Sequence, residues 1–386
     1  ILSTLVRDKE IGKYVVPIVP DEARTFGMEG MFRQLGIYSS IGQLYEPQDS
    51  DQVMFYKEQK DGQILEEGIN EAGSFSSWIA AATSYSTTGI QTIPFYIFYS
   101  MFGFQRIGDL AWAAGDSRAR GFLLGATAGR TTLNGEGLQH EDGHSHLISA
   151  TIPNCVSYDP CFAYELAVII QNGLERMIQN QEDVYYYITV MNENYQHPEM
   201  PKNIEKNIIQ GIYKFSESKL KSPKVQLMGS GVILREVIEA AKMLESEWSI
   251  AADIYSVTSF TELRREALDG ERWNMLNPDK KQKVSIIQGI ISDKESPIVA
   301  STDYMKSYAE QIANFIPNKF VSLGTDGYGR SDSREALRSF FEVDRYYIVI
   351  AALKALVDSK KVDIDILTKA IKKYKMNNNK PNPVSI

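Results

Sequence analysis

Runs of apolar, β-favouring residues alternate along this chain with stretches that have helical periodicity. The apolar runs in the first half are 14–19, 93–99, 122–126, 152–158 and 184–191. Helical patterns at 74–86 and 162–178 separate some of these runs. Such alternation predicts an α/β fold, in which mainly parallel sheets are flanked by helices.

A polar stretch with two prolines, 197–207, interrupts the alternation and is the interdomain linker that we expect. Beyond it, a second set of elements follows. The expected strands there are 225–228, 253–257, 298–301 and 320–323, and the expected helices are 232–244, 346–357 and 364–373. We therefore expect two domains, at residues 1–200 and 201–386.

Composition excludes several classes of protein. The 386 residues are 43% hydrophobic, which is enough for packed cores, and the net charge of −8 argues against a protein that works by neutralising nucleic-acid phosphate. No apolar run approaches the roughly 20 residues that cross a bilayer, so we expect no membrane partner. Two cysteines, Cys155 and Cys161, provide neither a disulfide framework nor a zinc-ligand set and favour a reducing compartment.

The chain starts at Ile1 rather than at Met, and its first residues already have helical spacing. We expect the numbering to begin inside a longer protein, so a targeting signal would not be visible here. A long polar segment, 43–63, has no clear periodicity and is expected to be a mobile flap. An exposed insertion without a function is the alternative.

Three of the four histidines fall in one short run, where His140, Glu141 and His144 spell the HExxH pattern. Zinc peptidases carry this pattern on a helix, but the glycines around it disfavour helix. We expect 129–146 to be a ligand-binding loop at the carboxyl edge of a parallel sheet, without a metal site. A loop whose polar groups only satisfy one another is the alternative.

Glu71 stands at the start of an expected helix, where a carboxylate stabilises the helix dipole by roughly 0.3–1 kcal/mol. Capping alone would explain such a residue. The aromatic residues from Phe95 to Phe102 could equally be ordinary core. Neither feature decides the function by itself.

Longer runs carry a resemblance to a known family. The chain closely resembles the homodimeric bacterial pyruvate dehydrogenases in VPDEARTFGMEGMFRQLGIYS, EEGINEAG, IPFYIFYSMFGFQRIGDLAWAAGD, GRTTLNGEGLQHEDGHSH, PNCVSYDP, SVTSFTELRREA, ASTDYMKSYAEQI and LGTDGYGRSDSREALRSFFEVD. The resemblance extends over essentially the whole chain. It implies two transketolase-like domains, a middle one that holds the aminopyrimidine of thiamine diphosphate and a carboxy-terminal one. The family's GDG…Asn motif for diphosphate and Mg²⁺ is not found, so we expect the chain to lack the amino-terminal domain and to be inactive alone.

The resemblance also implies roles for individual residues. Glu71 matches the glutamate that activates the cofactor, Ile69 the residue that holds the cofactor bent, and Phe102 an aromatic that stacks on the aminopyrimidine. The residues that match polar groups around the substrate are Tyr99, Glu136, His140 and Glu22. The implied reaction is decarboxylation of pyruvate followed by reductive transfer of the acetyl unit to a lipoyl group.

The implied partners are a second copy of the chain and dihydrolipoamide acetyltransferase with its lipoyl domains, and the implied location is the bacterial cytoplasm. Two other classes stay open on the residues alone. One is a zinc-dependent hydrolase that uses His140 and His144, and the other is a non-catalytic dimerisation module.

Overall fold

The computed structural model describes residues 1–20 and 23–386, and these form two compact units. Unit 1 consists of 1–127, 148–156 and 170–190, and unit 2 consists of 128–147, 157–169 and 191–386. The two histidines of the HExxH pattern thus belong to unit 2, whereas Glu71 belongs to unit 1.

Unit 1 is built on a six-stranded sheet with the order β4-β1-β5-β6-β8-β7. Its strands are β1 (Val15–Val19), β4 (Leu65–Glu66), β5 (Ile93–Tyr99), β6 (Phe122–Ala126), β7 (Cys155–Tyr158) and β8 (Tyr185–Thr189). Neighbouring strands from β4 to β8 pair in parallel. The expected strands 93–99 and 122–126 are confirmed to the residue, while the other three are shorter than expected.

Two helices, α3 (Glu71–Ala82) and α5 (Gly103–Asp116), pack on this sheet. Their buried faces form an aromatic core with the strands, in which Phe75 stacks on Trp78 and Trp78 meets the edge of Tyr185. Aromatic side chains bury large apolar areas, so this cluster contributes much of the unit's stability. The remaining short helices before Gly103 are α1 (Leu2–Leu5), α2 (Phe32–Leu35) and α4 (Ser84–Thr87).

The polar segment 43–63 contains one short strand, β3 (Glu58–Gln59), which pairs in parallel with β2 (Ile37–Tyr38). The carboxylate of Asp49 pairs with Arg24 and accepts the Tyr56 backbone N–H at 3.0 Å. The segment therefore has fixed contacts, and its role as a mobile flap stays a prediction.

Unit 2 contains a five-stranded sheet with the order β13-β12-β10-β11-β9. The strands are β9 (Ile212–Ser216), β10 (Lys224–Gly229), β11 (Ala251–Val257), β12 (Ile298–Ser301) and β13 (Phe320–Leu323). Only the edge strand β9 runs antiparallel within this sheet. The α/β class with mainly parallel sheets is therefore confirmed.

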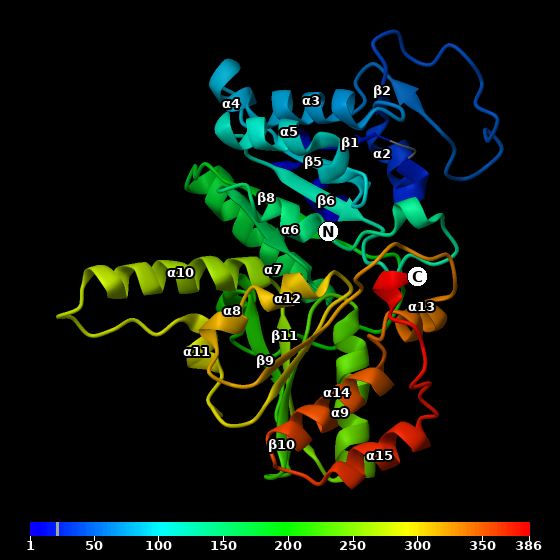
Figure 1. Cartoon of the computed structure of the whole chain (residues 1–386). Helices are drawn as coiled ribbons and strands as arrows, with labels where there is room; N and C mark the ends of the chain where they lie inside the picture. Colours follow the sequence, from blue (N-terminus) through cyan, green and yellow to red (C-terminus); the bar gives the residue numbers. More distant parts are fainter. Residues whose placement is uncertain (21–22) are drawn as a thin grey trace. The chain divides into compact units, whose positions relative to one another are not determined.

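Helices cover both faces of the second sheet (Figure 1). One core lies under α9 (Ile233–Trp248), α14 (Arg345–Asp358) and α15 (Ile364–Lys373), and the other under α10 (Phe260–Leu276), α11 (Ile286–Ile290) and α12 (Lys306–Glu310). Apolar residues on both faces of a strand are typical of sheets buried between helices, and every residue of β11 is buried. The other helices are α6 (Ser145–Ser149), α7 (Ala163–Leu174), α8 (Glu205–Gln210) and α13 (Arg334–Phe340).

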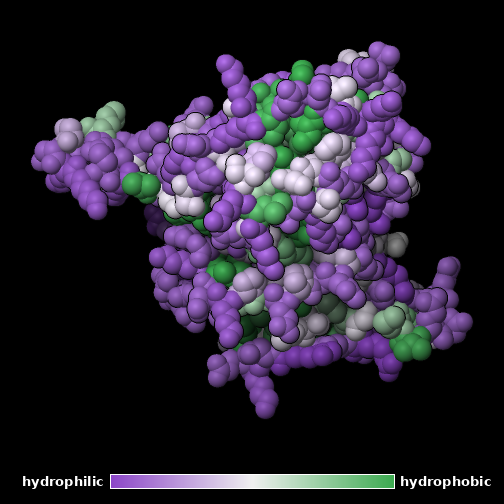
Figure 2. All heavy atoms as spheres, turned by 90° about the horizontal axis from the view of Figure 1, so that it is seen from below, coloured by the Kyte–Doolittle hydropathy of each residue, from purple (hydrophilic) through white to green (hydrophobic). Residues whose placement is uncertain are grey.

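Hydrophilic residues cover most of the face drawn in Figure 2, and the hydrophobic ones gather in smaller patches between them. Within the described residues, no helix combines the length and apolar character that crossing a bilayer requires.

Candidate functional site

Glu71 is the first residue of α3, but it does not cap the helix. The cap is Asn70, whose side chain accepts the backbone N–H of Gly73 at 3.0 Å. The Glu71 carboxylate instead accepts a hydrogen bond from Arg106 Nη1, although its side chain is only 13% exposed. The acid at this helix start is therefore not explained by capping.

Hydrogen bonds fix the start of α3 to the sheet. The hydroxyl of Ser74 donates to the Asn70 carbonyl at 2.9 Å and lies 3.0 Å from the Tyr96 hydroxyl. Tyr96 in turn donates to the Glu71 carbonyl at 3.3 Å. Burial, with added repulsion from the charge of Glu71, raises the pKa of Tyr96, which keeps this phenol a donor. The backbone that carries the Glu71 side chain is held firmly.

Aromatic residues lie next to this carboxylate at the end of β5. The Arg106 guanidinium sits over the Phe102 ring, 3.9 Å from its centroid, so Arg106 connects Phe102 with Glu71. The ring of Tyr99 meets the edge of Phe102 at 5.8 Å and the edge of Phe26 at 5.4 Å. Glu71, Phe102 and Tyr99 thus form one cluster in unit 1.

Two other residues of the predicted site belong to this part of the sequence. Ile69 lies two residues before α3 and is 79% exposed, so its side chain is available to a ligand. Glu22 lies outside the described residues.

In unit 2, Glu136 and His140 are close to each other. His140 ends a 3₁₀ helix, Leu138–His140, and its Nδ1 lies 4.0 Å from a Glu136 carboxylate oxygen. The His140 side chain is mostly buried, whereas that of Glu136 is half exposed. The two side chains are neighbours, but 4.0 Å is too long for a hydrogen bond between these two atoms.

Residues 129–144 form a loop with one 3₁₀ turn, as the glycines predict, whereas the last two residues of the expected loop, Ser145 and His146, begin α6. His140 lies on this turn, whereas His144 precedes α6 in a separate segment, so the two histidines do not share a helical face. Among the residues that the structure describes, no three His, Cys, Asp or Glu side chains are grouped to hold a metal ion. The arrangement is unlike the helical HExxH site of zinc peptidases.

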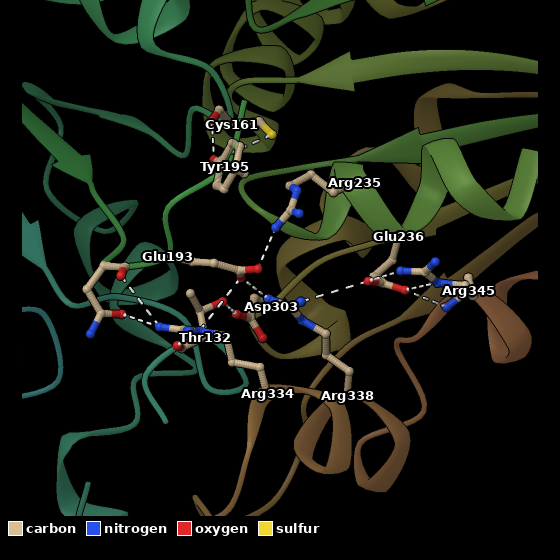
Figure 3. Close-up of polar contacts among 11 residues, drawn as sticks. Thr132, Cys161, Glu193, Tyr195, Arg235, Glu236, Asp303, Arg334, Arg338 and Arg345 are labelled. Carbon is tan, nitrogen blue, oxygen red and sulfur yellow. Dashed lines mark hydrogen bonds and ion pairs between the residues drawn. The ribbon is translucent and has the colours of Figure 1, made fainter. Parts of the chain in front are cut away.

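A buried aspartate anchors this loop. Asp303 accepts the backbone N–H and the hydroxyl of Thr131 at 2.9 and 2.7 Å. It also accepts the hydroxyl of Thr132 at 2.6 Å (Figure 3). Burial raises the pKa of Asp303, while these hydrogen bonds oppose the shift. The buried Arg130 donates to the carbonyls of Thr325 and Gly327, which ties the loop to the segment after β13.

Glu141, next to His140, is fully buried. Its Oε2 accepts the backbone N–H of Arg330 at 2.6 Å, and its Oε1 has no hydrogen-bond partner among the described residues. Burial raises its pKa to about 7, against the opposing effects of the Arg330 hydrogen bond and the Arg130 charge. Glu141 therefore titrates near neutral pH, one residue away from His140.

Several of these residues were not predicted from the sequence. The sequence gives only a weak indication of a role for Arg106. It lies one helical turn after Phe102, so the two side chains can contact the same ligand. Asp303 lies in the run ASTDYMKSYAEQI, but its partners are about 170 residues away. No local pattern reveals such a contact.

Two family models match the chain. The model of the pyruvate dehydrogenase E1 component middle domain matches residues 1–198, and that of the transketolase-like C-terminal domain matches residues 211–344. Solved structures agree on the fold. A Campylobacter jejuni transketolase aligns over 92% of this chain and 45% of its own, with a TM-score of 0.62 and 14% identity. A split-gene transketolase described as an inactive β4 tetramer aligns over 92% of this chain and 95% of its own, with a TM-score of 0.58 and 16% identity.

Curated relatives are much closer in sequence. The pyruvate dehydrogenase E1 component of Pseudomonas aeruginosa is 64% identical over 386 residues, which is 100% of this chain and 44% of that protein. The Escherichia coli E1 component is 58% identical over 384 residues, 99% of this chain and 43% of that protein. The chain thus spans less than half the length of these relatives. With a family model over its first 198 residues and this identity throughout, the chain belongs to the pyruvate dehydrogenase E1 component family.

Proposed function

We propose that this chain supplies the aminopyrimidine-binding part of a thiamine-diphosphate-dependent enzyme that decarboxylates pyruvate and passes the acetyl unit to a lipoyl group. The names of its relatives support the reaction. The observation that carries the proposal is the Glu71 carboxylate, which is mostly buried beside Phe102 although Asn70 already caps α3.

The residues of unit 1 fit the aminopyrimidine half of the cofactor. An aromatic ring at Phe102 gives a stacking surface, and Glu71 offers an acid for a ring nitrogen. Ile69 lies two residues before Glu71 in the sequence and is exposed. When bound, the cofactor supplies the electron sink for decarboxylation. We propose that Glu71 holds a proton against ring N1′, and that Arg106, which now pairs with Glu71, moves aside or bridges to the ligand.

The polar residues have proposed roles around the substrate. His140, with Glu136 beside it, would move a proton near the reacting carbonyl, and Tyr99 would donate to developing negative charge. Glu22, outside the described residues, is proposed for the same region. We further propose that residues outside these 386 bind the diphosphate and its Mg²⁺.

At the level of the whole protein, we propose a homodimer that works with dihydrolipoamide acetyltransferase in the bacterial cytoplasm. We also propose a domain boundary at about residue 200. The match to the first family model ends at residue 198, and the match to the second begins at residue 211. The extended segment between β8 and α8 contains this point.

The test uses the full-length protein. With thiamine diphosphate and Mg²⁺ present, we expect pyruvate-dependent reduction of a redox dye and acetylation of an added lipoyl domain. Omission of thiamine diphosphate should abolish both signals. Turnover of pyruvate without the cofactor, or none with it in a correctly folded protein, would contradict the proposal.

A further inference from the structure

A pocket of about 740 Å³ in unit 2 is lined by none of the residues of the proposed active site, although its Arg334 donates to the Thr132 carbonyl in the loop that carries His140. Residues from α9, α13, α14 and the segment after α15 line it. Its basic side chains are Arg235, Arg334, Arg338, Arg345, Lys375 and Lys380. Four acidic side chains also line it, so the lining carries an excess of two positive charges in a chain whose net charge is −8. We call it the arginine pocket.

Arg338 is the buried centre of this lining. Its guanidinium lies between two carboxylates, with Nη2 2.5 Å from Glu193 and Nη1 3.8 Å from Glu236 (Figure 3). The side chain is 8% exposed, and its Nε has no hydrogen-bond partner among the described residues. A buried N–H without an acceptor is rare and calls for an explanation. Arg338 lines the pocket and keeps one unused donor, which is buried and would reach a ligand only after the side chain shifts.

The same two carboxylates hold two further arginines. Arg345 donates to both oxygens of Glu236 at 2.9 Å, and Arg235 donates to Glu193 at 2.5 Å. A guanidinium has five N–H donors, so each retains donors beyond these bonds. Both side chains are partly exposed, at 38% and 35%. In Figure 3, Arg235 lies above Glu193, and Arg345 lies on the other side of Glu236 from Arg338.

The two carboxylates remain ionised at neutral pH. Burial acts to raise the pKa of Glu193, but Arg338 and Arg235 outweigh it and hold the pKa below its usual value. Burial is likewise outweighed at Glu236, where Arg345 and Arg338 lower the pKa. The arginines are thus held in position before any ligand arrives, which reduces the entropy lost on binding.

The location favours an anion for a second reason. The pocket lies beside the first turn of α9, which follows β10, and a helix amino terminus favours negative charge. The start of α14 also lines the pocket, but the Glu236 and Asp344 carboxylates already accept its backbone N–H groups. In the sheet order, β10 lies between β11 and β12. The chain passes from β10 to β11 on one side and later from β12 to β13 on the other, so the strand order reverses between β10 and β12. In open α/β sheets, ligands bind at the carboxyl edge at such a point.

We propose that the arginine pocket binds a small, multiply charged phosphate compound. Guanidinium groups match the oxygens of a phosphate in pairs, and the excess positive charge favours an anion with more than one charge. Tyr346 and Tyr374 also line the pocket, with ring centroids 5.2 Å apart. They give a nucleobase a surface to pack on, so either a nucleotide or an inorganic polyphosphate fits this chemistry.

The test is calorimetric titration of the full-length enzyme, saturated with thiamine diphosphate and Mg²⁺ so that the cofactor's own diphosphate site is filled. Adenosine diphosphate and inorganic triphosphate are the two probes. We expect saturable binding with one site per chain, weakening as salt rises. If adenosine diphosphate binds more tightly, the two tyrosines contribute to binding by packing on the base. If triphosphate binds more tightly, the pocket recognises its ligand by charge alone.

Arg345→Gln and Lys375→Gln should each weaken binding at least about tenfold. The matched control is Lys354→Gln, which removes one positive charge from α14 outside the pocket and should change affinity less than about twofold. Arg345→Gln also leaves Glu236 short of a partner and could disturb folding. Lys375 is exposed and lies outside that buried network, so Lys375→Gln alone decides the test. Absence of saturable binding, or equal affinity in Lys375→Gln and Lys354→Gln, would overturn the proposal.

Discussion

Glu71 and Glu165 both lie in the first turn of a helix, yet the two carboxylates are held in opposite ways. Glu71 pairs with one arginine, whose own side chain is 46% exposed. Glu165, at the start of α7, is fully buried and accepts four hydrogen bonds from neutral donors. The donors are the Cys161 N–H, the Phe162 N–H, the Tyr213 hydroxyl and the Ser256 hydroxyl.

This difference separates an exchangeable carboxylate from a structural one. A single, partly exposed ion pair contributes little to stability and can be replaced by a ligand. If Glu165 moved, the two backbone N–H groups and the Ser256 hydroxyl would be left without an acceptor, and each such loss costs about 1–3 kcal/mol, whereas Tyr213 also lies 2.6 Å from the Tyr164 hydroxyl. Burial raises the pKa of Glu165 despite these bonds. We therefore expect mutations at Glu71 to change catalysis and mutations at Glu165 to change folding.

The largest expected effect is that of Glu71→Gln in the full-length enzyme. Glutamine keeps the shape but cannot hold a proton against the cofactor, so turnover should fall by roughly 10² or more. Stability should change by at most about 1 kcal/mol, because Asn70 remains as the cap. The measurements are steady-state turnover with pyruvate and urea unfolding of the same preparation.

The matched control for Glu71→Gln is Glu205→Gln, which removes an exposed first-turn carboxylate from α8. It should leave turnover near the wild-type value. Equal turnover in Glu71→Gln and Glu205→Gln would show that Glu71 is not catalytic. The contrast drawn between Glu71 and Glu165 would then be wrong.

Glu165→Ala should lower the free energy of unfolding by at least about 3 kcal/mol, because it leaves two backbone N–H groups and the Ser256 hydroxyl without an acceptor. Glu165→Gln should cost only about 1 kcal/mol, since the two hydroxyls can turn and accept from the amide. Chemical denaturation measures both variants. A turnover defect in folded Glu165→Gln as large as that of Glu71→Gln would erase the distinction between the two acids.

Glu141 is an intermediate case, with one oxygen bonded and the other without a partner among the described residues. Its pKa of about 7 exceeds the ordinary 4.5, so between these values the folded protein keeps a proton that the unfolded chain has lost. Its stabilising contribution is present below pH 4.5 and is lost as pH rises through about 7. In Glu141→Gln, the decline in stability from pH 5 to pH 8 should be smaller by about 2 kcal/mol.

Urea unfolding of wild type, Glu141→Gln and Glu205→Gln at both pH values measures this difference. The exposed Glu205→Gln control should follow the wild type. If Glu141→Gln follows it as well, then Glu141 does not hold a proton in the folded state.

The smallest expected effect is that of Arg106→Lys on stability. The lysine keeps the positive charge near Glu71 but loses the planar contact with Phe102, and the pair is partly exposed, so the free energy of unfolding should change by less than about 1 kcal/mol. A loss of more than about 3 kcal/mol would show that this pair is as structural as the bonds of Glu165.

Much of the fold could be predicted because apolar runs mark buried strands. β5 and β6 agree to the residue, since every position of β5 up to Phe98 is buried and the pattern is continuous. The edge strand β9 was missed, because it is short and half of it is polar. The long helix α10 was missed despite a clear signal, the Ser259 side chain that accepts the Glu262 N–H at its start.

The candidate site was less predictable for a physical reason. Recognised motifs identify individual side chains such as Glu71, but ion pairs depend on where the fold brings distant charges. Arg106 lies 35 positions from Glu71, and Arg338 lies 145 positions from Glu193. With 41 basic and 49 acidic residues in the chain, sequence alone does not select these pairs.

The aromatic core of unit 1 has an optical consequence. Trp78 is fully buried against Phe75 and Tyr185, whereas Trp112 on α5 is 52% exposed. Dissolved quenchers such as iodide reach the fluorescence of Trp112 and not that of Trp78, whose emission comes from an apolar environment. When Trp112, Trp248 and Trp273 are all replaced by phenylalanine, the emission left in this chain is that of Trp78, and it reports the packing of the same sheet and helix that carry Glu71.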